Sequence, residues 1–259
     1  MLEAVFKGFL EVGACCGRRQ EVVSVKEMDG QQGLKMPLDL YYTSSCAHCR
    51  SVMLTAKALE LELNLKRVDL CMKEQLQPDF LELNPQHCVP TLVDDGFVLW
   101  DSRAICTYLV SKYGKDDSLC PKELRTRAML DRLLYFDIDK LVQRFGKYVY
   151  PVLFEGQEPD KDQLPCIDEA LGCLDQFLTG QIGAVSPKIT IADHILVATV
   201  STIEAVGIDF TRHKNLCNWL RKCKSNIPGY TEINEPGARE AGEIFKEKLA
   251  SKETEVDKA

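Results

Sequence analysis

Two cysteines stand three residues apart at a point in the chain where a thiol can be reactive. Cys46 and Cys49 follow an apolar segment, 38–42, that predicts a strand, and they open the segment 46–61, whose apolar residues have helical spacing. The first turn of a helix leaves backbone N–H groups unpaired and carries partial positive charge, so a thiol there ionises more easily. A Cys-x-x-Cys motif between a strand and a helix is typical of thiol–disulfide exchange, and a protonated His48 would stabilise the thiolate further. The competing interpretation is a buried structural Cys49 beside an incidentally exposed Cys46.

A proline just before a predicted strand is the second feature. Pro90 blocks sheet pairing at its own position and permits a cis bond after Val89. A cis bond would turn the Val89 backbone outward, where its N–H and C=O could pair with a peptide-like ligand, and the neighbouring His87 could meet a carboxylate. The competing interpretation is an edge-strand proline next to a solvent-facing histidine.

The third feature is a pair of charges at the predicted start of a helix over 102–113. Ser102 is expected to cap this helix, with Asp101 and Arg103 on either side. Helix N–H groups and Ser102 suit the carboxylate of a zwitterionic amino-acid end, and Asp101 suits its ammonium group. An ordinary N-cap with solvated charges is the competing interpretation.

These motifs fall on loops of a segment whose predicted elements alternate between strand and helix. Asp94-Asp95-Gly96 is a strong hairpin signal between the last two strands. The predicted order β-α-β-α-β-β-α is that of a compact α/β unit, and it favours an α/β domain over 37–115. The predicted elements cover residues 38–42, 46–61, 63–70, 78–83, 89–93, 97–100 and 102–113.

The remainder of the chain has a helical pattern. Thr190 and Asp193 form a capping box, which we expect to be structural. We expect an all-helical domain over 121–248, a flexible extension over 1–36 and a charged tail over 249–259. The predicted helices cover residues 122–149, 162–179, 190–206, 213–224 and 235–248.

The composition is that of an ordinary globular chain and excludes several classes of function. The 259 residues carry a formal net charge of −7, so there is no global basic field to attract nucleic acid or anionic lipid. No apolar run is long enough to cross a bilayer, and the first ten residues do not have the pattern of a signal peptide. We therefore expect a cytoplasmic protein whose 12 cysteines are mostly free, small and buried.

Long stretches of the chain resemble the insect delta and epsilon glutathione transferases. The similarity extends from Leu38 to about Glu232 and includes the runs CRSVMLTAKALELELNLK, LNPQHCVPTLVDDGFVLWDSRAI, YLVSKYGKDDSL and ITIADHILVATVSTIEA. The resemblance implies an α/β plus all-α fold, with a thioredoxin-like glutathione-binding domain followed by a helical-bundle substrate-binding domain. It implies glutathione as co-substrate, no metal, and no nucleic-acid or membrane partner. It also implies a homodimer that pairs through helix 102–113 and the helix beginning near Leu124.

The resemblance assigns ligand-binding roles to particular residues. His87 would contact the glycine end of glutathione, the Val89 backbone before Pro90 would pair with its cysteinyl residue, and the next loop would hold its γ-glutamyl end. The predicted glutathione-binding residues are His87, Val89, Pro90, Asp101, Ser102 and Arg103. A pocket for a small hydrophobic electrophile would be lined by Tyr148, Tyr150 and Phe154, unless these aromatic residues are helix core.

Cys46 departs from the pattern of that group, which usually has a serine whose hydroxyl bonds the glutathione sulfur. A cysteine can instead attack a disulfide and form a mixed disulfide with glutathione, and family branches such as the omega group favour that chemistry. Ser45 or Ser44 could take the serine's role if the turn shifts by one residue. Three hypotheses follow: conjugation of glutathione to hydrophobic electrophiles, thiol transfer by Cys46, and binding of glutathione or apolar ligands without turnover. Conjugation ranks first because the resemblance is so extensive.

Overall fold

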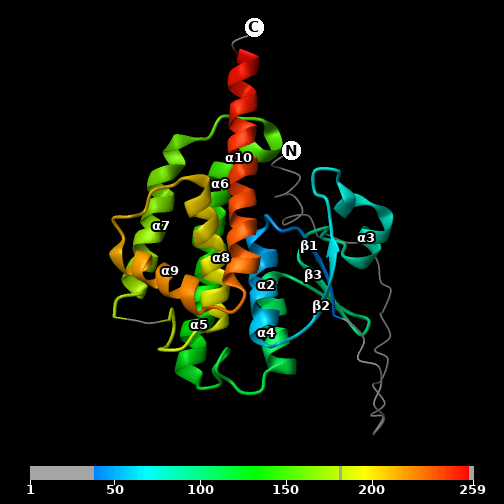
Figure 1. Ribbon diagram of the computed structural model, residues 1–259, viewed down its shortest axis with the longest axis vertical. Coiled ribbons are helices and arrows are strands. Elements are labelled where there is room, and N and C mark those ends of the chain that lie inside the picture. The colour runs from blue at the N-terminus through cyan, green and yellow to red at the C-terminus, as the bar shows by residue number, and fades with distance from the viewer. Residues whose placement is uncertain (1–37, 181–182, 257–259) are drawn as a thin grey trace, which may run out of the picture. The chain divides into compact units, whose positions relative to one another are not determined.

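The computed structural model describes residues 38–180 and 183–256, the last five by their backbone alone. The first half is an α/β unit built on four strands: β1 Leu38–Tyr42, β2 Leu63–Arg67, β3 Thr91–Asp94 and β4 Phe97–Trp100. The strand order is β2-β1-β3-β4, with β1 parallel to β2 and β3 antiparallel to both β1 and β4 (Figure 1). The predicted hairpin forms because Asp95 and Gly96 adopt positive φ angles of 50° and 80°.

Helices complete the α/β unit in the predicted order: α2 Ala47–Ala58, α3 Pro78–Leu83 and α4 Ser102–Tyr113, with a short 3-10 turn, η1, at Glu74–Leu76. Leu40, Leu92 and Ile105 are completely buried and belong to the main hydrophobic core.

Helix α2 is shorter than predicted. It begins one residue after Cys46, which is its N-cap, and it ends before Glu60, whose φ of 58° is left-handed and does not continue a right-handed helix.

Over the described residues the second half consists of helices and connecting loops. Its long helices are α5 Leu124–Phe136, α6 Gln143–Glu155, α7 Leu164–Phe177, α8 Ile191–Val206, α9 Lys214–Asn226 and α10 Glu235–Val256. Two π-helical turns, η2 Asp137–Val142 and η4 Tyr230–Asn234, and one 3-10 turn, η3 Lys161–Gln163, complete it. Helix α8 is central: every residue from 191 to 203 is buried, and α2 of the α/β unit and α10 both pack against it (Figure 1). None of the helices within 38–180 and 183–256 is long and apolar enough to span a bilayer.

The capping box at the start of α8 is confirmed. The backbone N–H of Thr190 donates to Asp193 Oδ2 at 2.8 Å, and the Thr190 hydroxyl also lies 3.0 Å from that oxygen. The other carboxylate oxygen of Asp193 accepts from the indole N–H of Trp219 at 2.8 Å and from the backbone N–H of Ala184 at 2.7 Å. This buried carboxylate therefore joins α8 to α9, which is a structural role.

The helical half differs from the sequence prediction at two boundaries. The helix predicted over 122–149 comprises α5, η2 and α6 and continues to Glu155. Helix α10 passes its predicted end at 248, so part of the predicted charged tail is helical, and Leu249 packs on a small cluster around Phe245. The predicted extension over 1–36 lies outside the described residues, and the two domain boundaries stay predictions.

The cysteines follow the prediction only in part. All ten in the described part of the chain have free thiols, as expected. However, the expectation that most are buried is wrong, since only Cys49, Cys106, Cys120 and Cys223 are buried. The other six described cysteines are half-buried or exposed, because they lie in turns and loops or on helix faces that are partly open to solvent.

Candidate functional site

The N-terminus of α2 is the centre of the site. Cys46 has extended backbone angles, φ −78° and ψ 117°, as an N-cap residue should, and it is partly exposed. A hydrogen bond from the Cys49 thiol is the largest of the effects that lower the pKa of Cys46 to about 7. Burial opposes the shift, while N–H groups of the first turn and the nearby Arg50 guanidinium support it. Cys49 is buried, and that burial raises the pKa of its thiol well above the ordinary value. The pKa of Cys46 is therefore lower than that of Cys49, as predicted for a thiol at the start of a helix.

His48 does not act as predicted. Its Nδ1 atom lies 3.0 Å from Arg103 Nη1, which donates to it, and 3.4 Å from Ser102 Oγ. Burial, with help from the positive charge of Arg103, lowers the pKa of His48 to about 3. The ring is neutral near pH 7, so the expected stabilisation of the Cys46 thiolate by protonated His48 is wrong.

Asp101, not Ser102, caps helix α4. The Oδ1 atom of Asp101 accepts from the backbone N–H groups of Arg103 at 2.9 Å and Ala104 at 3.2 Å. Asp101 has a positive φ of 69° and is exposed, and its Oδ2 atom has no hydrogen bond within the described part of the chain. Ser102 is buried at the first helical position, where Arg103 Nη1 donates to its hydroxyl at 3.1 Å. The sequence analysis assigned the N-cap to Ser102 instead of Asp101 because serine and aspartate are both good N-cap residues.

Arg103 joins the two halves of the chain. Its Nη2 atom forms a buried ion pair with Asp137 in η2, while Nη1 contacts Ser102 and His48. The positive charge of Arg103 is thus paired with the Asp137 carboxylate of the helical half. Its Nε atom is buried and has no hydrogen-bond partner among the described residues.

The loop before β3 has a cis bond between Val89 and Pro90, which the sequence permitted without requiring it. Asn84 organises this loop, since its Nδ2 atom donates to Cys88 O at 3.1 Å and to Thr91 Oγ1 at 2.8 Å. Val89 is half-buried, and within the described residues its N–H and C=O have no hydrogen-bond partner. His87 is exposed and has a left-handed φ of 43°. The adjoining Cys88 lies within electrostatic reach of Asp101 and Cys46, so the three predicted loops converge.

The predicted aromatic residues of α6 separate into two faces. The rings of Tyr150 and Phe154, 43% and 64% exposed, lie 5.9 Å apart. Burial raises the pKa of the Tyr150 hydroxyl to about 12, and Cys46 contributes to that shift, so the hydroxyl lies within electrostatic reach of the thiol. Tyr148 instead lies 5.8 Å from Phe245 of α10, because residues two apart on a helix face nearly opposite directions. The structure brings Tyr150 and Phe154 together, without Tyr148.

Arg50 is a positioning residue that the sequence prediction missed. It is fully buried, and its Nη1 atom donates to the carbonyl oxygens of Ser44 at 3.3 Å and Ser45 at 3.2 Å. From the same guanidinium, Nε donates to Asn234 Oδ1 at 3.1 Å, and Nη2 donates to the helix α8 residues Ala198 and Thr202. The turn that precedes Cys46 is thus tied to the helical half. The available signal was a long charged side chain among the small and apolar residues of α2.

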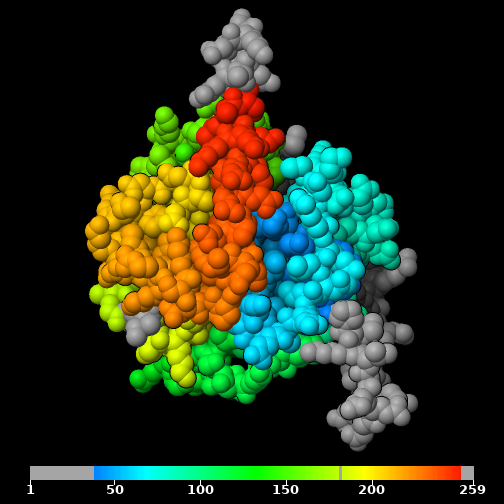
Figure 2. All heavy atoms as spheres, viewed as in Figure 1, coloured from blue at the N-terminus to red at the C-terminus, as the bar shows by residue number. Residues whose placement is uncertain are grey.

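Gly237 holds the same turn from the other side. A Cβ atom at this position would lie 2.3 Å from the Ser44 carbonyl oxygen and 2.6 Å from Arg50 Cδ, so only glycine permits so close an approach of α10. Figure 2 shows α10 bordering on the first residues of the α/β unit. Ser45 is partly exposed, and its hydroxyl has no hydrogen bond among the described residues, so it stays a candidate for the serine role.

A thioredoxin-like domain with a mixed four-stranded sheet, followed by an all-helical domain, defines the class of protein. Residues 45–112 match the sequence model of the family described as Glutathione S-transferase, N-terminal domain. Glutathione S-transferase D7 of Anopheles gambiae is 45% identical over 212 residues, which cover 81% of this chain and 97% of that relative.

Two solved structures are similar along most of the chain. A delta-class glutathione transferase of Nilaparvata lugens is 48% identical with a TM-score of 0.80, and the match covers 82% of this chain and 100% of the other. An epsilon-class glutathione S-transferase of the housefly, Musca domestica, is 39% identical with a TM-score of 0.78, and the match covers 82% and 98% of the two chains. The chain belongs to the glutathione S-transferase family and is an enzyme.

Proposed function

We propose that this enzyme conjugates the thiolate of glutathione to small hydrophobic electrophiles, with the glutathione sulfur beside Cys46. One observation carries the proposal. The exposed aromatic pair Tyr150 and Phe154 belongs to the helical half, yet the Tyr150 hydroxyl lies within electrostatic reach of Cys46 in the α/β half. An apolar surface beside a helix N-terminus that stabilises thiolates suits a reaction between a thiolate and an apolar electrophile. The proposed pocket is thereby narrowed to these two aromatic residues.

The proposed glutathione site uses the three converging loops. The free Oδ2 atom of Asp101 receives the γ-glutamyl ammonium group, and the Ser102 hydroxyl receives its carboxylate, while the N–H groups of Arg103 and Ala104 stay bonded to Asp101 Oδ1. The unpaired backbone groups of Val89, before Pro90, pair with the cysteinyl residue, and the exposed His87 meets the glycine carboxylate. Arg103 fixes the Ser102 hydroxyl at 3.1 Å.

The chemical step needs an ionised sulfur held against the electrophile. The first turn of α2 and the Arg50 charge favour the thiolate, whose proton leaves to water. With an aryl halide, the carbon–sulfur bond forms and the halide departs with the bonding electrons of the carbon–halogen bond. The two binding surfaces align the reactants, which converts a bimolecular reaction into one within a complex.

A second candidate function, thiol transfer, is favoured by the Cys46–Cys49 pair. A thiol with a pKa of about 7, hydrogen-bonded to a buried second thiol, suits thiol–disulfide exchange. The Cys46 thiolate would attack the glutathione sulfur of a mixed disulfide and release the other thiol. A second glutathione thiolate would then attack the Cys46 mixed disulfide, giving glutathione disulfide and restoring Cys46.

A pair of assays on matched variants separates the two functions. Conjugation of 1-chloro-2,4-dinitrobenzene is measured with wild type, Cys46→Ser and Cys46→Ala, as is reduction of the mixed disulfide of glutathione and 2-mercaptoethanol. Conjugation that persists or rises in Cys46→Ser supports the first function. Disulfide reduction that disappears in Cys46→Ser supports the second. Absence of conjugation in the wild type over a broad panel of electrophiles would contradict the primary proposal.

We also propose a homodimer and a cytoplasmic location. Large apolar side chains are exposed on and beside the helices expected at the dimer interface. Leu124 and Tyr135 of α5 are 82% and 73% exposed, and Phe97, 49% exposed, lies 5.2 Å from the Tyr108 ring of α4. The free thiols of the ten described cysteines suit a reducing compartment.

A further inference from the structure

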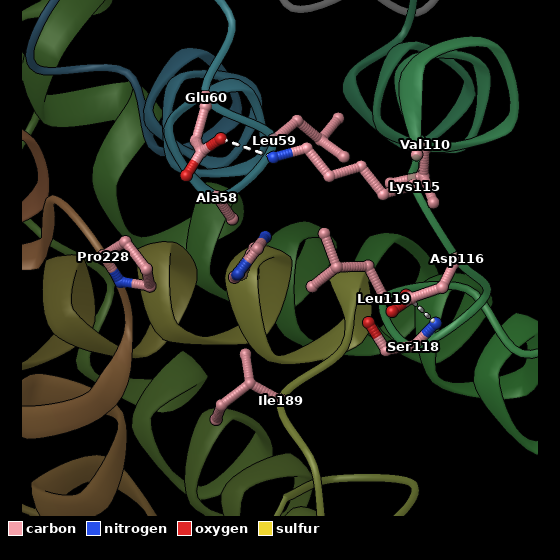
Figure 3. A pocket seen from close by; sticks show the side chains of 12 residues that line it. Ala58, Leu59, Glu60, Val110, Lys115, Asp116, Ser118, Leu119, Ile189 and Pro228 are labelled. Atoms are coloured by element: carbon pink, nitrogen blue, oxygen red, sulfur yellow. Dashed lines mark hydrogen bonds and ion pairs between the residues drawn. The ribbon is translucent and has the colours of Figure 1, made fainter.

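A cavity of about 290 Å³ lies at the end of α2 opposite to Cys46, and no role has been assigned to it (Figure 3). It is bounded by the ends of α2 and α4, the connector that follows α4, and the start of α8. At its edge, the exposed side chains of Lys115 and Glu60 form an ion pair at 2.6 Å and neutralise each other. The apolar lining residues are Ala58, Leu59, Val110, Leu119, Ile189 and Pro228.

His194 of α8 also lines this cavity, and its tautomer follows from its neighbours. Its Nδ1 atom lies 3.0 Å from Thr55 Oγ1. We assign the single proton of the Thr55 hydroxyl to the carbonyl oxygen of Ser51, 2.9 Å away, which can only accept; Cys106 Sγ, 3.3 Å from the hydroxyl, can donate its own proton. With this assignment Thr55 accepts from Nδ1–H of His194. The other ring nitrogen, Nε2, then has a lone pair and no proton.

The Nε2 atom is the chemically unexplained group of the cavity. It is buried and has no hydrogen-bond partner in the described part of the chain. Burial lowers the pKa of His194 to about 4, so the ring is neutral near pH 7. A buried acceptor without a donor is costly, so the unpaired Nε2 atom requires an explanation.

We propose that this cavity binds an uncharged, largely apolar molecule with one N–H or O–H group, which donates to Nε2 of His194. A cavity of about 150 Å³ is enough to bind benzene, so the space here suits a one- or two-ring compound. Because Nε2 is itself buried, the proposal requires a change of rotamer among the partly buried lining side chains, such as Leu59 and Leu119. The neutral imidazole leaves the buried part of the cavity without charge. The Lys115–Glu60 ion pair and the Asp116 carboxylate, which accepts from the Ser118 N–H at 2.9 Å, are exposed at its edge. The site is separate from the proposed glutathione site and does not depend on its assignment.

The test uses two probes of nearly the same shape, indole and benzofuran, in which an N–H donor is replaced by an ether oxygen. Their affinities for the full-length protein are measured by ligand-observed NMR, with and without saturating S-hexylglutathione. Two variants are compared with wild type. His194→Phe removes the acceptor, and Ala58→Phe fills the cavity from the end of α2.

We expect indole to bind wild type about tenfold more tightly than benzofuran, the value of one hydrogen bond to a buried acceptor. The ratio should approach one in His194→Phe, and Ala58→Phe should abolish binding of both probes, while S-hexylglutathione should leave indole binding unchanged. If His194→Phe does not fold, the proposal is still tested by the ratio of indole to benzofuran affinity in wild type and by the loss of binding in Ala58→Phe. Any of four results would overturn the proposal. Wild type could bind the two probes with equal affinity, or S-hexylglutathione could displace indole. Ala58→Phe could leave binding unaffected, or wild type could fail to bind indole at millimolar concentration. The last result would mean that the cavity holds water only.

Discussion

Replacing Cys49 by alanine should make Cys46 a much weaker acid. The pKa of Cys46 lies at about 7, against an ordinary value of 9.0, and the hydrogen bond from Cys49 is the first cause of that difference. A hydrogen bond to a charged group contributes about 1.5–3 kcal/mol, and about 1.4 kcal/mol corresponds to one pKa unit. Cys49→Ala should therefore raise the pKa of Cys46 by roughly one to two units. At pH 7 the ionised fraction should fall from about one half to between roughly one tenth and one hundredth.

The assay is the rate of alkylation of Cys46 by iodoacetamide as a function of pH, followed by mass spectrometry of the Cys46 peptide. The rate should rise with pH through about 7 in wild type and through about 8 to 9 in Cys49→Ala, because the thiolate is the nucleophile. Cys49→Ser is the matched control, since its hydroxyl can still donate to Cys46. S-methylglutathione, which has no free thiol, should protect wild-type Cys46.

Two results would refute this reasoning. If Cys46 titrates at or above about 8.5 in wild type, the first turn of α2 does not stabilise its thiolate. If Cys49→Ala and Cys49→Ser titrate alike and close to wild type, the hydrogen bond from Cys49 is not the cause of the shift. In the first case the thiolate-stabilising role would pass to the Ser45 or Ser44 hydroxyl, or be absent.

Four further predictions follow from particular contacts. Asp101→Ala should weaken glutathione binding by about 1.5–3 kcal/mol in calorimetry, and Asp101→Asn, which preserves the N-cap, should show the same loss if the charge is the cause. Gly237→Ala places a Cβ 2.3 Å from the Ser44 carbonyl oxygen and should lower kcat/KM for glutathione at least about tenfold; an unchanged value would show that the turn does not depend on α10. The pKa of His194 is lower in the folded chain, about 4, than in the unfolded chain, so its contribution to stability is complete above about pH 6.5 and is lost as pH falls. The free energy of unfolding in urea should therefore drop by about 1.4 kcal/mol more in wild type than in His194→Phe between pH 7.5 and 5.5. Tyr135→Glu should shift the protein from dimer to monomer in sedimentation equilibrium, and a monomeric wild type at micromolar concentration would contradict the proposed homodimer.

Several features were predictable because their causes are local in the chain. The order of strands and helices follows from apolar spacing, which the structure confirms from β1 to α4. The hairpin at Asp95-Gly96 follows from residues that tolerate positive φ. The capping box of Thr190 and Asp193 was likewise predicted from neighbouring residue types, and Pro90 marked a place where a cis bond was permitted. In each case the deciding interaction spans only a few residues.

The protonation states in the site depended on residues far apart in the chain. The sequence places His48 beside Cys46 and suggests a cation there, but burial and the charge of Arg103, 55 positions away, keep the ring neutral. Arg103 itself is held by Asp137 of the helical half. Because the pKa of a group depends on its burial and on the charges around it in space, residue type and spacing alone cannot fix it.

The sequence by itself determined the family, the order of the elements and the thiol at the start of α2. Only the tertiary structure decided which groups face that thiol. It brought the Tyr150 hydroxyl within electrostatic reach of Cys46, placed Tyr148 against α10, and tied the preceding turn to α8 through Arg50. The physical reason is that local patterns fix helices and turns, whereas the orientation of these helix faces is settled by packing against elements that are distant in the chain.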